Sequence, residues 1–86
     1  GPDAVEDRTM AALASPCYSV TLSRDAYNAS IPWSADAMAL AAKRVRRTDR
    51  LYGFRYDFAD KATALAFCDA VGVSAFDCFS YRTGGN

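Results

Sequence analysis

The chain has 86 residues, of which 51% are hydrophobic and 13% aromatic, and its 10 basic and 10 acidic residues leave a formal net charge of zero. This composition is too apolar and too balanced in charge for a disordered chain, and its apolar stretches are too interrupted to span a membrane. The length is typical of one small hydrophobic core, and the zero net charge excludes a whole-molecule attraction to polyanions.

The two ends of the chain are expected to lie outside the packed core. Residues 1–16 begin with Gly1-Pro2, which has the form of a scar left when a protease removes an expression tag, and the rest is interpreted as a flexible N-terminal arm. Residues 83–86 carry no large apolar side chain and predict a disordered tail. A single α+β domain is therefore expected over residues 17–82.

The three cysteines, Cys17, Cys68 and Cys78, are odd in number and widely spaced. This pattern fits neither a disulfide framework nor a paired metal-ligand motif. No apolar N-terminal segment that follows a basic region resembles a signal peptide. We therefore expect a reducing, cytoplasmic setting, with no metal and no cofactor.

Residues 17–23 alternate apolar and polar side chains, which is the period of a half-buried strand. One face of this strand carries Tyr18, Val20 and Leu22. Residues 24–33 also alternate and are interpreted either as an edge strand that returns from a turn or as a structured loop. Pro32 limits any strand here to an edge, because it has no N–H to donate to a neighbouring strand.

Residues 35–47 are predicted to form the first helix. Ser34 is suited to the N-cap, Asp36 falls in the first turn, and the basic residues up to position 47 would complement the negative end of the helix dipole. The predicted buried stripe follows the helical period and consists of Met38, Ala41, Ala42 and Val45.

Residues 51–58 form the clearest strand in the sequence, because the hydrophobic period there switches to two. The face predicted to be buried carries Tyr52, Phe54, Tyr56 and Phe58. The opposite face carries Leu51, Gly53, Arg55 and Asp57. Four aromatic side chains beside amphipathic helices are more typical of a core than of a binding platform.

Over these few residues the strand is similar to the central strand of the RNA-recognition motif, which carries a basic residue, a glycine and aromatic side chains that stack on bases. The likeness departs from that pattern at Asp57 and has no matching first-strand motif. It therefore does not assign the chain to that family.

Asp60 is predicted to cap a second helix, and Gly72 stands where a left-handed residue commonly ends one. The buried stripe of this helix is Ala64, Phe67, Cys68 and Val71. Residues 76–82 alternate again and predict a last strand. One face of that strand carries Phe79 and Tyr81.

The order of these elements favours a small two-layer α+β sandwich, in which two helices cover one face of a three- or four-stranded mixed sheet. A ferredoxin-like or related arrangement is expected. That fold joins its middle strands by a hairpin, whereas the sequence predicts only one strand between the two helices.

The absence of histidine disfavours catalysis, because it removes the commonest general base and the usual partner of a nucleophile. The cysteines fall on predicted strand or helix faces and are interpreted as packing residues. No glycine-rich loop precedes a helix that would bind phosphate. We therefore expect that the chain is not an enzyme.

One functional hypothesis rests on a basic cluster in residues 43–50, which consists of Lys43, Arg44, Arg46, Arg47 and Arg50. A nucleic-acid-binding module would use such a cluster to contact phosphates, with an affinity that falls as salt rises. The alternative is a solvated helix end that suits the helix dipole, with Asp49 neutralising part of the charge. Nucleic acid is therefore the second choice of partner.

The preferred hypothesis is a protein partner. A two-layer domain leaves one sheet face open, here the mixed face with Arg55 and Arg82, and large aromatic residues in a loop or edge, such as Tyr27 and Trp33, are costly without a use. Tyr, Trp and Arg are enriched in interface hot spots. The predicted partner-binding residues are Trp33, Tyr27, Arg55 and Arg82.

The expected function is thus a non-enzymatic protein–protein interaction module that acts through an open sheet face or edge. It would serve as an adaptor, or as an inhibitor of a larger protein of the kind that mobile elements encode. Homodimerisation through the same surface is the other expected outcome. No membrane partner is expected.

Overall fold

The computed structural model describes residues 16–82 of the chain. Its elements in chain order are β1 (Cys17–Ser23), α2 (Arg24–Ser30), α3 (Ala35–Ala42), β2 (Arg46–Arg50), β3 (Gly53–Phe58), α4 (Lys61–Val71), α5 (Ala75–Cys78) and β4 (Phe79–Arg82). Apart from Pro16, the predicted arm over residues 1–16 lies outside the described residues, and so does the predicted tail over residues 83–86.

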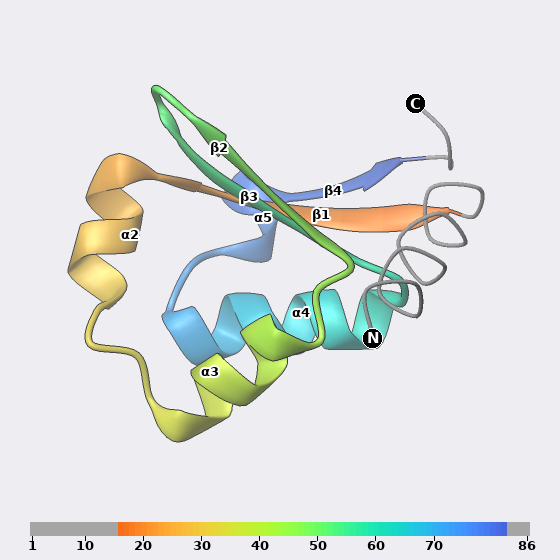
Figure 1. Cartoon of the computed structure of the whole chain (residues 1–86), viewed down its shortest axis with the longest axis horizontal. Helices are drawn as coiled ribbons and strands as arrows, with labels where there is room; N and C mark the ends of the chain where they lie inside the picture. The colour runs from red at the N-terminus through yellow and green to blue at the C-terminus, as the bar shows by residue number, and fades with distance from the viewer. Residues whose placement is uncertain (1–15, 83–86) are drawn as a thin grey trace, which may run out of the picture.

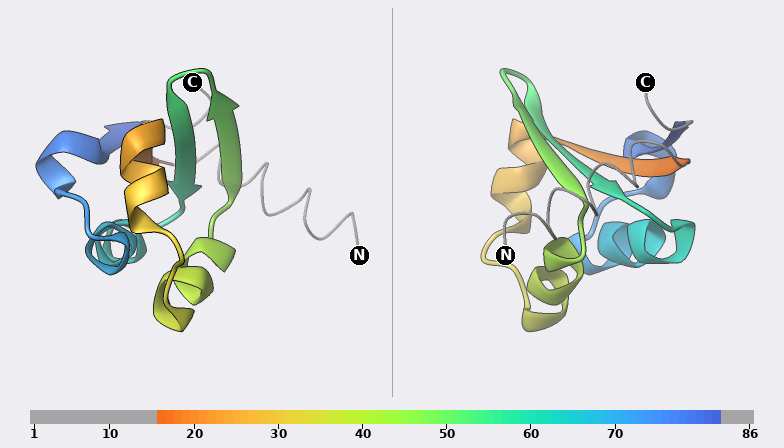
Figure 2. Two further views of the ribbon diagram at one scale, coloured as in Figure 1. Left: turned by 90° about the vertical axis from the view of Figure 1, so that its left-hand side faces the viewer. Right: turned by 45° about the vertical axis from the view of Figure 1, so that its right-hand side comes forward.

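The four strands form one sheet in the order β2-β3-β1-β4, with β1 and β3 at its centre (Figure 1). Helices α3 and α4 lie side by side below the sheet, and α2 packs at the end where β1 stops (Figures 1 and 2). The predicted two-layer α+β sandwich is confirmed. When the short helices α2 and α5 are set aside, the order β1-α3-β2-β3-α4-β4 is that of the ferredoxin-like fold.

The sequence analysis predicts a mixed sheet, and this prediction is wrong: all three pairs of neighbouring strands are antiparallel. Its two helical crossovers join β1 to β2 and β3 to β4. A crossover connection joins parallel strands, but in each of these pairs another strand lies between the two members. Every pair of neighbouring strands therefore runs in opposite directions.

Strand β2 is the largest difference from the sequence prediction, which extends the first helix to residue 47. Helix α3 ends at Ala42, and the backbone N–H of Lys43 donates to the carbonyl oxygen of Leu40 at 3.0 Å. Arg46–Arg50 pair with β3 instead. This strand supplies the hairpin that a ferredoxin-like fold requires, and the sequence hid it because its charged residues have no apolar alternation.

The shorter α3 also presents a different face to the core. Ala37 and Ala41 are buried, whereas Met38 and Ala42 are exposed, so the predicted stripe is wrong at those two positions. Val45 is buried but follows the helix rather than belonging to it. The prediction is based on a helix that continues to residue 47. The observed helix has eight residues and packs against α4, and this contact determines which of its side chains are buried.

The segment predicted as an edge strand or loop over residues 24–33 contains a helix, α2. The Ser23 hydroxyl oxygen accepts a hydrogen bond from the backbone N–H of Ala26 at 3.0 Å and caps that helix. Because α2 has seven residues, it is too short to show the helical period clearly, and the chance alternation of Tyr27, Ala29 and Ile31 resembled a strand.

The core lies between the aromatic face of the sheet and helices α3 and α4. Tyr56 and Phe58 are buried and Phe54 is half-buried, as predicted, whereas Tyr52 is exposed because it lies in the hairpin turn. All four residues of the predicted stripe on α4 are buried. Gly72 ends that helix in the left-handed conformation, with a φ of 76°.

The predicted strand over residues 76–82 begins later than expected. Ser74 caps the short helix α5, and β4 starts at Phe79. Phe76 lies on α5 and is 100% exposed. The prediction that it belongs to a strand is therefore wrong. Phe79 and Tyr81 lie next to the ring of Tyr18, with ring centroids 5.9 Å and 4.9 Å from it.

Replacing Asp60 with alanine is expected to lower the free energy of unfolding by about 1 kcal/mol, because Asp60 caps α4. The backbone N–H of Thr63 donates to its carboxylate at 2.8 Å, and the Thr63 hydroxyl donates at 2.7 Å. These hydrogen bonds lower the pKa of Asp60, which means that the folded state favours the carboxylate.

The cap is therefore fully effective above the pKa of the unfolded chain, about 4, and is lost as the pH falls through the lower pKa of the folded state. Urea unfolding at pH 7 and pH 3 should show that the effect of Asp60→Ala shrinks at the lower pH. Asp69→Ala, which removes an exposed carboxylate from the same helix, is the control. Equal effects of the two variants at pH 7 would contradict the capping role.

Candidate interaction site at the β2–β3 hairpin

The turn between β2 and β3 carries the most exposed apolar side chains of the sheet. Arg50 pairs with Gly53, so Leu51 and Tyr52 form a two-residue loop. The side chain of Leu51 is 92% exposed and that of Tyr52 is 66% exposed. The hairpin extends beyond the other strands (Figure 2). We call Leu51, Tyr52 and the three neighbouring arginines, Arg24, Arg47 and Arg50, the hairpin site.

Arg24, the first residue of α2, holds this turn in place. Its Nε atom donates to the carbonyl oxygen of Leu51 at 2.6 Å, and its terminal nitrogen donates to that of Arg50 at 3.3 Å. Its backbone N–H also donates to the carbonyl oxygen of Tyr52 at 3.1 Å. The exposed turn is therefore ordered before any partner arrives, which reduces the entropic cost of binding.

Arg47 and Arg50 occupy different environments on the same strand. The Arg47 guanidinium lies 4.8 Å from the ring centre of Phe54, and its Nε atom contacts Asp49 at 2.9 Å. Within the described part of the chain, the side chain of Arg50 has no ion pair or hydrogen bond. Arg50 is therefore the cation of the hairpin site that is available to an acidic partner.

The predicted open face of the sheet is not bare at its centre. Asp57 is 1% exposed, and its carboxylate accepts a hydrogen bond from the Ser19 hydroxyl at 2.6 Å and one from Arg46 Nε at 3.0 Å. Arg55 Nε lies 3.3 Å from the same carboxylate. The long side chains of Arg46 and Arg55 lie along this face, and they keep the carboxylate paired where burial would otherwise be costly.

The structure separates the four predicted partner-binding residues. Trp33 lies among core aromatic rings, with its ring centroid 5.6 Å from that of Phe67, and its indole N–H donates to the Ser30 hydroxyl at 2.7 Å. Tyr27 contacts Trp33 and is also half-buried. Arg55 lies on the opposite sheet face beside Asp57. Arg82 ends β4, and its side chain lies outside the described residues.

The basic cluster of residues 43–50 is also divided. Arg44 donates to the carbonyl oxygen of Ala41 at 2.9 Å, and Lys43 lines a groove beside α4. Arg46 is paired with Asp57 on one face of the sheet, whereas Arg47 covers aromatic rings on the other. The cluster is therefore not a single positive patch.

The arrangement of β3 does not support a base-stacking platform. Phe54, Tyr56 and Phe58 face the helices, whereas the RNA-recognition motif presents its aromatic side chains on the exposed face. Among the described residues of β1 and β3, the face away from the helices carries serine, threonine, cysteine, glycine, arginine and aspartate side chains. No aromatic ring lies there.

Burial raises the pKa of the Cys68 thiol to about 11, so this sulfur stays protonated at neutral pH, the opposite of what a nucleophile requires. Burial also raises the pKa of Cys78. Within residues 16–82 no cluster of three acidic or cysteine side chains is placed to hold a metal ion. In the same residues, no helix is long and apolar enough to span a membrane.

Sequence reasoning missed the hairpin site, although it named Arg47 and Arg50 for another purpose. Gly53 follows the two apolar residues of the turn, but a glycine alone does not signal a tight hairpin. Comparisons of the chain with protein-family models, with curated proteins and with solved structures found no match.

Proposed function

We propose that the chain is a non-enzymatic protein–protein interaction module that docks through the hairpin site on an acidic surface of a larger protein, as an adaptor or an inhibitor. The observation that carries this proposal is the pair of exposed apolar side chains, Leu51 and Tyr52, in a hairpin site that also contains three arginines. An apolar centre with a polar rim, enriched in Tyr and Arg, is the composition of interface hot spots.

Two further features support this use of the hairpin. The turn is held by Arg24, so binding does not have to order it. Strand β2 is at the edge of the sheet, and its exposed charged residues discourage uncontrolled pairing with other strands. The three free cysteines are in keeping with a reducing, cytoplasmic setting.

Nucleic acid is the second candidate partner, because Arg50 adjoins the turn that carries the exposed Tyr52, a side chain that can stack on a base. It is less favoured because carboxylates already neutralise two cations of the basic cluster. Arg46 pairs with Asp57, and Arg47 pairs with Asp49. Few phosphate contacts would remain to supply affinity.

The double variant Leu51→Ser/Tyr52→Ser is expected to lose its protein partner while remaining folded, because both side chains are exposed. Affinity capture from an extract of the native cell, with and without nuclease, is the measurement. Recovery of the partner should fall by tenfold or more, since a hot-spot residue contributes about 2 kcal/mol. Nuclease treatment should leave the recovery unchanged.

Phe76→Ser is the matched control, because Phe76 is also bare but lies on α5, away from the hairpin. It should retain the partner. Loss of capture after nuclease treatment would transfer the assignment to nucleic acid. Capture that survives the double variant would show that the partner binds elsewhere, and the proposal would then be wrong.

A further inference from the structure

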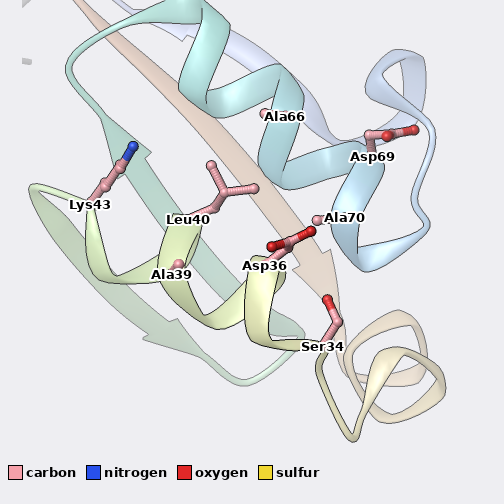
Figure 3. Close-up of a pocket in the computed structure, with 8 residues that line it drawn as sticks. All are labelled: Ser34, Asp36, Ala39, Leu40, Lys43, Ala66, Asp69 and Ala70. Carbon is pink, nitrogen blue, oxygen red and sulfur yellow. The ribbon is translucent and has the colours of Figure 1, made fainter.

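A groove of about 470 Å³ lies between α3 and α4, on the opposite side of the molecule from the tip of the hairpin (Figures 1 and 3). Leu40 points from α3 toward α4 at the middle of this groove, where the small side chains of Ala66 and Ala70 leave room. Asp36 lies at one end and Lys43 at the other (Figure 3). The groove is thus apolar in its middle and charged at its ends.

The end of the groove beside the last turn of α4 is acidic. Asp36 and Asp69 both line it, and neither carboxylate has an ion-pair partner among residues 16–82. Asp69 also lies in the last turn of α4, where the helix dipole is negative and where no basic residue compensates it. A cation at this end of the groove would be attracted by both carboxylates.

The hairpin tip has the complementary pattern. Leu51 is bare, and beside it Arg50 has no partner among the described side chains. The chain as a whole has no net charge, so two copies do not repel each other at long range. The exposed Leu51 side chain is complementary to the apolar middle of the groove, and the Arg50 guanidinium is complementary in charge to the two carboxylates at its end.

We propose that the α3–α4 groove binds the hairpin tip of a second copy, with Leu51 against Leu40 and the Arg50 guanidinium between Asp36 and Asp69. The inference rests on the proposed function, because it uses the same hairpin site, which a second copy and the larger protein would occupy in turn. The groove and the tip are different surfaces of one molecule, so the contact is heterologous: a dimer keeps one free groove on one copy and one free hairpin on the other. Association therefore proceeds head to tail and weakens as salt screens the charges.

The test is a mixing experiment followed by analytical ultracentrifugation at low salt. The hairpin variant is Arg50→Glu/Leu51→Ser, and the groove variant is Asp36→Lys/Asp69→Lys, all at exposed positions. Each variant alone should remain a monomer as its concentration rises to about 1 mM. An equimolar mixture should form a 1:1 dimer, because the hairpin variant contributes the intact groove and the groove variant contributes the intact hairpin.

The unmodified chain should form a concentration-dependent series of dimers and larger species that raised salt reduces. Monomers at all concentrations, or a mixture that stays monomeric while circular dichroism shows both variants folded, would overturn the inference. A dimer of the unmodified chain that both variants retain would assign self-association to another surface and overturn it equally. Partner capture by the groove variant tests the proposed function separately, since that variant keeps its hairpin site.

Discussion

Substituting Gly53 with alanine is expected to lower the free energy of unfolding by about 3 kcal/mol or more, a large effect for a single added methyl group. A Cβ atom at this position would overlap the carbonyl oxygen of Leu22 and would lie 2.9 Å from the Cα atom of Ser23. Both are backbone atoms of the central strand β1, which cannot rotate away as a side chain would. The β1–β3 pairing at Ser23 and Gly53 must therefore open.

Urea unfolding followed by the fluorescence of the single tryptophan, Trp33, measures this effect. Gly72→Ala is the control, because Gly72 has a φ of 76° but no atom within 4 Å of an added Cβ atom. That variant should lose about 1 kcal/mol from the left-handed backbone alone. If Gly53→Ala loses no more than Gly72→Ala, the close approach of β1 is not what requires glycine.

Replacing Asp57 with alanine is expected to cost about 3 kcal/mol of the free energy of unfolding, because a buried ion pair loses one member. The change would leave the Ser19 hydroxyl, which is buried, without its acceptor at 2.6 Å. It would also leave Arg46 and Arg55, whose side chains are only 30% and 24% exposed, without the carboxylate that they share. Neither arginine can lose its charge to reduce the cost.

Asp49→Ala is the matched control for Asp57. It removes the carboxylate of a second aspartate–arginine pair on the same hairpin, but Asp49 is exposed, so the loss should be below about 0.5 kcal/mol. Both variants can be measured by urea unfolding at pH 7 and moderate salt. Similar losses for the two variants would mean that burial adds nothing to the Asp57 network.

The parts of the fold that the sequence predicts well are those with local signals. Helix α4 has its cap at Asp60, its left-handed end at Gly72 and a complete apolar stripe between them, and all of these are confirmed. In strands β1 and β3 the larger apolar side chains recur at every second residue, because each strand has one face against the helices. In each case the residues that specify the element lie within the element itself.

The hairpin could not be predicted in this way, because β2 depends on its neighbour. Its residues, Arg46–Arg50, are charged or polar, and their partners, Asp57 and the ring of Phe54, lie on β3. The turn also lacks the Asn-Gly or Asp-Gly pair that signals a tight hairpin. No residue other than glycine in the described part of the chain has a positive φ, so Leu51 and Tyr52 form the turn without one.

The hairpin site could not be predicted either, because its residues come together only in the folded chain. Arg24 and Leu51 are 27 positions apart in the sequence, and only the fold brings the Arg24 guanidinium to the turn. The sequence, by contrast, predicts Tyr27 and Trp33 at a surface, because residues 24–33 have the pattern of an edge strand or a loop. Once α2 forms, both aromatic rings turn toward Phe54 and Phe67 in the core.

The position of β1 has a consequence for how the protein is made. Among residues 16–82, β1 is the first strand, yet its two neighbours begin at Gly53 and Phe79. Until Gly53–Phe58 have been synthesised, Val20 and Leu22 have no strand partner among these residues, so β1 can join the sheet only when the β2–β3 hairpin can also form. The fourth strand, β4, can complete the sheet only after Phe79–Arg82 have been synthesised.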